Sequence, residues 1–318
     1  MGINSGIDFI FNNFLIVVPT DAKGELAGLA AACLWAVASV VYGVVGQRIP
    51  PLQLNLIKGI VAIAFLILTI LISGELLPNL PPVSVFLLFI SGVVGIGLGD
   101  TAFLAAINSL GARRVLLIGT LSPPMTAIAA NIILQEQLNI SAWCGILLTI
   151  LGVAWVVTER VPETDGVSTT NLWPGIGFAL LAATTNASGT VISRLAFAAG
   201  SVTPLWAALL RLSAAVLVLL IWVWFPNRQE KTLSYPYWQS WRIILATCFA
   251  AFCGTYLGIW LQQTAIKFTA AGIASTLMQT SPLFVIPITI GMGEKVSWRA
   301  IAGVIIAIAG IGLLFYLK

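Results

Sequence analysis

The chain has 318 residues, of which 59% are hydrophobic and only 8% are charged, and its formal net charge is +4. Soluble domains carry roughly 25% charged residues, so this chain has too little polar surface to fold as one, and we expect an integral membrane protein. The small, scattered positive charge does not indicate a nucleic-acid partner, and it fits cationic side chains beside anionic lipid.

The sequence contains no histidine, which removes the commonest general base and the commonest metal ligand. Its four cysteines lie in apolar runs, with neither zinc-ligand spacing nor a framework for disulfides, and we interpret them as small buried hydrophobic residues. Neither an aspartyl dyad nor a Ser–His pair can be assembled from the spans. We therefore expect no enzyme, no cofactor and no metal site.

Residues 1–24 form a lead-in whose apolar part is too short to span a membrane and lacks a basic region before it, so we expect a disordered or interfacial segment. A spanning helix needs roughly 20 mostly apolar residues. Ten such runs follow, at 25–46, 52–73, 83–107, 112–134, 139–158, 173–194, 203–225, 240–264, 270–291 and 297–317. The expected fold class is an all-α membrane protein of ten helices.

An internal repeat divides these helices into two sets. The segments AINSLGA, SPPM and QEQL, which start at Ala106, recur about 158 residues later as AIKFTAA, SPLF and GEKV, which start at Ala265. The two units, 25–158 and 173–318, are joined by a polar linker at 159–172. Five helices is an odd number, so the second unit must enter the membrane from the opposite face, which makes an inverted-topology repeat.

The distribution of lysine and arginine predicts an orientation. Four of these residues lie on the side of the two termini and nine on the other side. Because cytoplasmic loops carry the excess of positive charge, this bias places both termini outside.

The first helix carries AACLWAVASVVY. Further motifs occur once in each unit and in the same order. A proline precedes a cation by seven residues, as Pro51 with Lys58 and as Pro204 with Arg211. The segment GDTAFLAAINSLGA of the first unit corresponds to GIWLQQTAIKFTAA of the second. With this ordered set the chain resembles the EamA family of the drug/metabolite transporter superfamily, from about residue 24 onward. The resemblance implies ten helices, a central cavity between inverted halves, and transport of small metabolites. Family members usually have arginine where this chain has Lys58.

Ionisable groups inside spanning helices are costly and are candidates for function. Lys58, Asp100 and Arg211 are such groups. Lys58 and Asp100 are each expected about 10 Å from the same membrane face, at ~1.5 Å of rise per residue, so they could pair. Asp100 has no acidic counterpart in the second unit, where Ile259 aligns with it, and we predict that it carries protons. The alternative for the two cations is a packing or interfacial role.

Further candidates are neutral. Tryptophans inside the helices could stack on substrate, and amides could bond to it, although helix packing is an alternative for each. Prolines that break the fourth and ninth helices are hinge candidates. Two glutamates at helix ends have a predicted structural or gating role. The tryptophans are Trp35 and Trp260, and the amides are Asn186, Gln262, Gln263 and Gln279. The prolines are Pro123, Pro124 and Pro282, and the glutamates are Glu136 and Glu294.

The sequence thus predicts a secondary transporter for small metabolites, amino acids among them, that works by alternating access and is driven by protons or by exchange. A sugar-phosphate or nucleotide-sugar antiporter and a channel or scramblase are the alternatives. The expected surroundings are the lipid bilayer of the cell inner or plasma membrane, and the expected ligand is a small molecule. A monomer is favoured over a dimer, because the duplicated chain already contains both halves.

Overall fold

The computed structural model describes residues 22–46, 49–74, 80–110, 112–158, 172–224, 241–291 and 297–316. These residues form helices without any strand. The first unit contains α2 (Lys23–Val45), α3 (Pro51–Ser73), α4 (Pro82–Gly92), the π-helical segment η2 (Val93–Asp100), α5 (Thr101–Leu110), α6 (Ala112–Gly119), α7 (Ser122–Leu134) and α8 (Ile140–Thr158). The second contains α9 (Leu172–Ala199), α10 (Pro204–Trp224), α11 (Trp241–Ala250), the π-helical segment η5 (Ala251–Leu257), α12 (Gly258–Phe268), α13 (Ala271–Met278), α14 (Ser281–Gly291) and α15 (Trp298–Tyr316).

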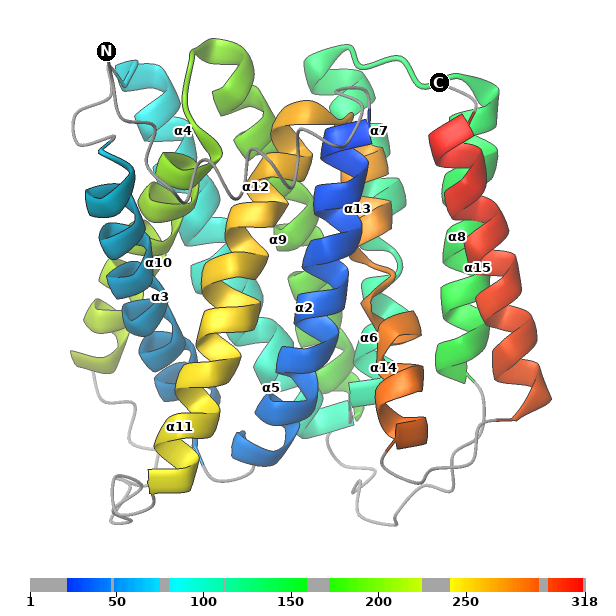
Figure 1. The fold of residues 1–318 in the computed structure, drawn as a ribbon, viewed down its shortest axis with the longest axis horizontal. Coiled ribbons are helices and arrows are strands. Elements are labelled where there is room, and N and C mark those ends of the chain that lie inside the picture. Colours follow the sequence, from blue (N-terminus) through cyan, green and yellow to red (C-terminus); the bar gives the residue numbers. More distant parts are fainter. Residues whose placement is uncertain are drawn as a thin grey trace.

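Ten stretches of the described chain are long and apolar enough to cross a membrane, which confirms the predicted helices. They run up and down in one bundle, and α2 begins where α15 ends, at the top of Figure 1. We call this side the terminal face and the other the opposite face. The lead-in up to residue 21 and the linker at 159–171 lie outside the described residues, as does Glu294.

Three helices continue further toward the membrane faces than predicted. The third reaches Leu110, the sixth Ala199 and the eighth Phe268, whereas the expected ends were 107, 194 and 264. Arg194 and Lys267 thus lie within the sixth and the eighth helix. Arg194 donates hydrogen bonds to the carbonyl oxygens of Ile266 and Lys267, and Lys267 donates one to that of Val202.

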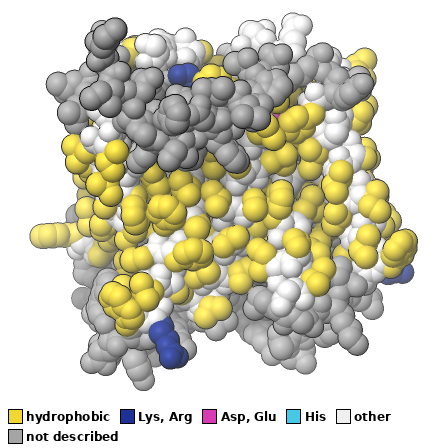
Figure 2. Space-filling view, in the orientation of Figure 1, with side chains coloured by type: hydrophobic (Ala, Val, Ile, Leu, Met, Phe, Trp, Pro, Cys, Tyr) yellow, Lys and Arg dark blue, Asp and Glu magenta, His cyan; other side chains and the backbone are white. Residues whose placement is uncertain are grey.

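The outer surface of the bundle is apolar. In α3, for example, Leu66 is fully buried while Ile67 and Leu71 are 45% and 58% exposed. Large aliphatic side chains exposed in this number would be unfavourable in water. Figure 2 shows hydrophobic side chains across the middle of the visible face, with described cations toward its margins. The surface therefore suits a lipid environment.

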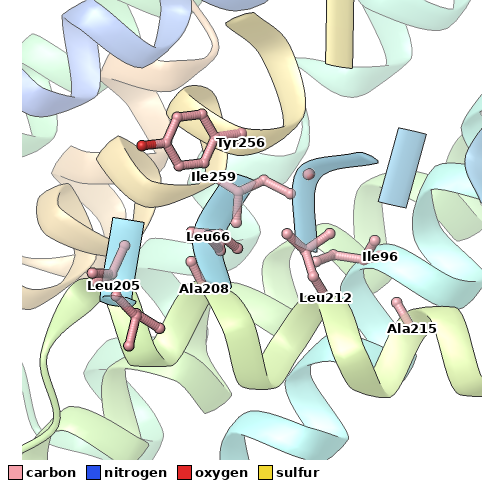
Figure 3. Packing of buried hydrophobic residues seen from close by; sticks show 10 residues of the cluster. Leu66, Ile96, Leu205, Ala208, Leu212, Ala215, Tyr256 and Ile259 are labelled. Atoms are coloured by element: carbon pink, nitrogen blue, oxygen red, sulfur yellow. The ribbon is translucent and has the colours of Figure 1, made fainter. Parts of the chain in front are cut away.

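A buried cluster joins the two units close to the charged groups. Leu66 of α3 and Ile96 of η2 pack against Leu212 of α10, Tyr256 of η5 and Ile259 of α12 (Figure 3). The hydroxyls of Tyr256 and Thr69 lie 2.6 Å apart in a hydrogen bond across the same contact. Since the cluster draws on both units, neither unit completes its core alone.

The last helices of the two units, α8 and α15, pack closely against each other through glycines (Figure 1). A methyl group on Gly303 would lie 2.8 Å from Val156 Cγ2 and 3.0 Å from the carbonyl oxygen of Gly152. One on Gly145 would lie 2.9 Å from Leu314 Cδ2. Only glycine permits such an approach of two helix backbones.

Two helices are broken at matching places. The fourth span is interrupted between α6 and α7, just before Pro123 and Pro124. The ninth is interrupted between α13 and α14, just before Pro282. Proline cannot supply the backbone N–H that would continue the ladder, so the break falls on the residues ahead of it. The prolines thus begin the second half of each span.

Candidate functional site

Lys58 and Asp100 form an ion pair inside the bundle. Lys58 Nζ lies 2.6 Å from Asp100 Oδ2, and the two side chains are 13% and 34% exposed. The structure confirms the expected pairing; the role of the pair in transport stays a prediction. Asp100 is the last residue of η2, so the π-helical turns set the direction in which its carboxylate points.

Asn55 holds the helix of Lys58 against the segment of Asp100. Its side-chain amide donates to the carbonyl oxygen of Ile96 at 3.2 Å and lies 3.1 Å from Thr101 Oγ1. Asn55 is only 1% exposed. A π-helical turn leaves carbonyls without their usual helical partner, and Asn55 bonds to one of them. This contact fixes α3 and η2 relative to each other at the ion pair.

Arg211 is buried on the other side of η2. It is 2% exposed, and its Nη1 donates to Gln262 Oε1 at 3.2 Å. Its Nε is buried without a hydrogen-bond partner. Gly92 lies against the backbone of Arg211, and a methyl group on Gly95 would lie 3.1 Å from Nη2. The cation of the first unit therefore meets a carboxylate, whereas that of the second meets a neutral amide.

The two candidate tryptophans pack against η5 and neighbouring helices. Trp35 Nε1 donates to the carbonyl oxygen of Gly254 at 2.8 Å, within η5. The rings of Trp260 and Tyr256 have centroids 6.0 Å apart. Trp35 thus joins the first helix of one unit to the π-helical segment of the other, which corresponds to the packing role that was its alternative.

The remaining amides lie in different surroundings. Asn186 Oδ1 accepts a hydrogen bond from Ser122 at 3.0 Å, at the start of α7. Gln279 follows the end of α13, and its Nε2 would lie 2.9 Å from a methyl group on Gly119. The two helix breaks therefore approach each other. Gln263 is fully buried, and neither of its side-chain polar atoms has a hydrogen-bond partner.

Glu136 lies at the centre of a network on the terminal face. Its carboxylate forms an ion pair with Arg194 and accepts the backbone N–H of Ala271, the first residue of α13, at 2.9 Å. Arg194 Nη1 also donates to the carbonyl oxygens of Ile266 and Lys267, at 3.0 and 2.6 Å. One ion pair thus supplies hydrogen-bond partners for backbone carbonyls at the end of α12 and for a backbone N–H at the start of α13.

Sequence reasoning placed Glu136 at a helix end but missed Arg194 as its partner. It also missed η2 and η5. The glycine string at 92–100 could have indicated the first of them, because glycine weakens a regular helix. No comparable signal marks Arg194, since its partner is 58 residues away in the chain. Among the described residues, no cluster of three or more histidine, cysteine or acidic side chains could hold a metal ion.

The model of the EamA-like transporter family matches twice, at residues 22–158 and 173–316. The chain belongs to the EamA-like transporter family. The two matches correspond to two five-helix repeats, as the internal similarity predicted.

The fold of this EamA-like chain also occurs in solved structures. One of them, titled only "Crystal structure of protein", has a TM-score of 0.75 and 17% sequence identity, and the match covers 93% of this chain and 98% of the other. At that identity the likeness concerns the fold alone. No curated protein sequence matches this chain. As an EamA-like protein, the chain is a multi-pass membrane transporter.

Proposed function

We propose that this EamA-like chain is a secondary transporter that moves small metabolites by alternating access, with Asp100 as the coupling group. The observation that supports it best is the ion pair of Asp100 with Lys58, 2.6 Å apart within spanning segments. A buried pair of this kind is costly to form and strongly destabilised when one partner is neutralised. Protonation of Asp100 is such a neutralisation, so it would release Lys58 and loosen α3 from η2.

The terminal face is the closed side in this proposal. There α7 packs against α13: Thr126 Oγ1 lies 3.3 Å from Ser275 Oγ, and a methyl group on Gly272 would lie 2.6 Å from Ala127 Cβ. The Glu136 network holds the start of α13 in the same region. We propose that Glu136 and Arg194 form the gate on this face. Pro123, Pro124 and Pro282 are the proposed hinges, because each follows a break in its helix.

The setting of the transporter is part of the proposal. We place it in the cell inner or plasma membrane as a monomer, with the terminal face outside, as the distribution of positive charge predicts. A single chain already supplies both repeats, and the cluster of Figure 3 joins them internally.

Transport by purified protein in proteoliposomes tests the proposal. Liposomes loaded with a pH-sensitive dye would receive each of the common amino acids and a set of small carboxylic acids under an imposed proton gradient. We expect saturable, solute-dependent proton movement in the wild type and none in Asp100→Asn. Glu163→Gln, which removes a carboxylate from the polar linker, is the matched control and should transport normally.

Unchanged solute-driven proton flux in Asp100→Asn would remove Asp100 from the mechanism. Flux that never saturates with solute concentration would indicate a pore and contradict the carrier proposal.

A further inference from the structure

We infer that the Nε–Nη2 edge of Arg211 is a binding site for a carboxylate group of the transported substrate. The inference rests on the proposed transport function only in assigning the carboxylate to a substrate. Its basis is the state of the Arg211 side chain, which is buried, charged and incompletely bonded.

Arg211 is 2% exposed and forms no ion pair within 4.0 Å with a carboxylate of the described residues. Asp100 attracts it electrostatically but is itself bonded to Lys58. Two cations and one carboxylate leave the group formed by Lys58, Arg211 and Asp100 with one excess positive charge. A buried charge in an apolar surrounding is costly unless it is paired, so this group is completed by an anion.

The free part of the guanidinium has a definite shape. Nη1 donates to Gln262, whereas Nε is buried with no hydrogen-bond partner. The Nε–H and the neighbouring Nη2–H point in the same direction and form one side of the planar fork. A carboxylate accepts both in parallel, and this bidentate pairing is what distinguishes arginine from lysine as a receptor.

Gly95 lies beside this edge. A methyl group on it would lie 3.1 Å from Nη2, 3.5 Å from Gly189 Cα and 3.9 Å from the carbonyl oxygen of Thr185, so a larger residue there would press on Nη2. Gly97, two residues further along η2, has no atom nearer than 3.9 Å to the same hypothetical methyl group. Gly95 and Gly97 therefore offer a matched pair of substitutions on one segment.

The test measures binding of a minimal carboxylate without requiring the natural substrate. Sodium propionate would be titrated against sodium chloride at constant ionic strength, and the melting temperature of the purified protein in lipid nanodiscs would be followed by tryptophan fluorescence. Propionamide, which has nearly the same shape and no charge, is the ligand control. We expect a saturable rise with propionate and none with propionamide.

Three variants locate the site. Arg211→Lys keeps the charge but loses the fork and should need about tenfold more propionate or worse, as expected for the loss of a charge-assisted hydrogen bond. Gly95→Ala keeps Arg211 and should also weaken the response, whereas Gly97→Ala should not. The wild-type response in Gly95→Ala would contradict the site even if Arg211→Lys failed to fold.

No propionate-dependent rise in the wild type, or an equal rise with propionamide, would overturn the inference. The inference would also be overturned if chloride raised the melting temperature as much as propionate does, because the site would then bind a halide ion and not a carboxylate in particular. A protein that binds propionate as expected but moves no solute in proteoliposomes would contradict the transport proposal and leave the carboxylate site standing. A protein that transports uncharged solutes but does not bind propionate would contradict the carboxylate site and leave the transport proposal standing.

Discussion

Lys58 and Asp100 illustrate what an ion pair does among apolar helices. The 2.6 Å contact compensates two charges that would otherwise be buried singly between α3 and η2. The pair matters less for the energy gained when it forms than for the cost of breaking it, since the remaining charge is shielded from solvent, Lys58 more so than Asp100.

A double-mutant cycle should reveal this coupling. We expect Asp100→Asn to lower the free energy of unfolding by about 3–5 kcal/mol, because it leaves the more buried Lys58 unpaired. Lys58→Met should cost less, because Asp100 is 34% exposed and is also attracted to Arg211. The double variant should lose clearly less than the sum of the two. Denaturant titration in detergent micelles measures all four proteins, and strictly additive losses would show that the pair is not coupled.

Trp35 offers a second test at a single residue. Trp35→Phe removes the Nε1 hydrogen bond to the carbonyl oxygen of Gly254 while keeping an aromatic ring. We expect a loss of about 1–3 kcal/mol in the free energy of unfolding, because the carbonyl loses a buried donor. Trp298→Phe, at a tryptophan that is 78% exposed, is the control and should change stability little. Equal effects of the two variants would contradict the role of the hydrogen bond.

At the residue scale, prediction from the sequence succeeded where the depth of a residue in the membrane is enough to decide whether two side chains can pair. Lys58 and Asp100 could be paired because both lie at countable distances from one membrane face. Arg211 and Gln262 were both candidates, but their hydrogen bond depends on how α10 and α12 face each other, which the residue count does not give. Glu136 and Arg194 belong to different repeats, and only tertiary structure shows that they meet.

At the scale of elements, the glycines of α8 and α15 are the clearest case of sequence dictating packing. Gly145 and Gly152 follow Glu136 by nine and sixteen residues, and Gly303 and Gly310 follow Glu294 by the same intervals, so their matching positions are visible in the sequence. The close approach of the two helices was not, because the same small residues also occur where a helix faces lipid, as at Gly312, which has no atom within 4 Å of a hypothetical methyl group.

This contrast gives a matched pair of variants within one helix. Gly303→Leu would force a side chain into Val156 and the backbone of Gly152, and we expect destabilisation of at least about 1–3 kcal/mol. Gly312→Leu adds the same side chain where space is open and should be close to neutral. Melting temperatures in detergent compare them; equal shifts would mean that α8 and α15 do not pack as described.

For the whole molecule, the Glu136 network decides how tightly the terminal face is held closed. It connects α9, the end of α12 and the start of α13 through one carboxylate and one guanidinium. Both partners are partly shielded, with side chains 16% and 26% exposed, so the pair is stronger than one at a fully solvated surface.

We therefore expect Glu136→Gln to shift the population toward a state that is open at the terminal face. A single cysteine at Ser275, in a background without the four native cysteines, should react faster with a membrane-impermeant maleimide in this variant. Arg242→Gln, which removes an exposed cation at the opposite face, is the control. Unchanged labelling in Glu136→Gln would argue against a gating role.

The ten spans and their division into two inverted repeats could be predicted from the sequence, because hydropathy and repetition are properties of the chain itself. The breaks before Pro123 and Pro282 followed from the chemistry of proline. The sequence could not supply the contacts between the repeats, such as the cluster around Tyr256 and Ile259, because the residues of one repeat do not show which of its helix faces pack against the other.

The two π-helical segments also bear on the history of the chain. η2 begins 13 residues before Ala106 and η5 begins 14 residues before Ala265, so they occupy the same place in the two repeats. A π-helical turn holds more residues than an α-helical one, and it is the form in which a helix absorbs an inserted residue. Two independent insertions at one place are far less economical than one. We therefore infer that the ancestor of both repeats already carried the insertion. The difference between Asp100 in one repeat and Ile259 in the other arose in the divergence that followed.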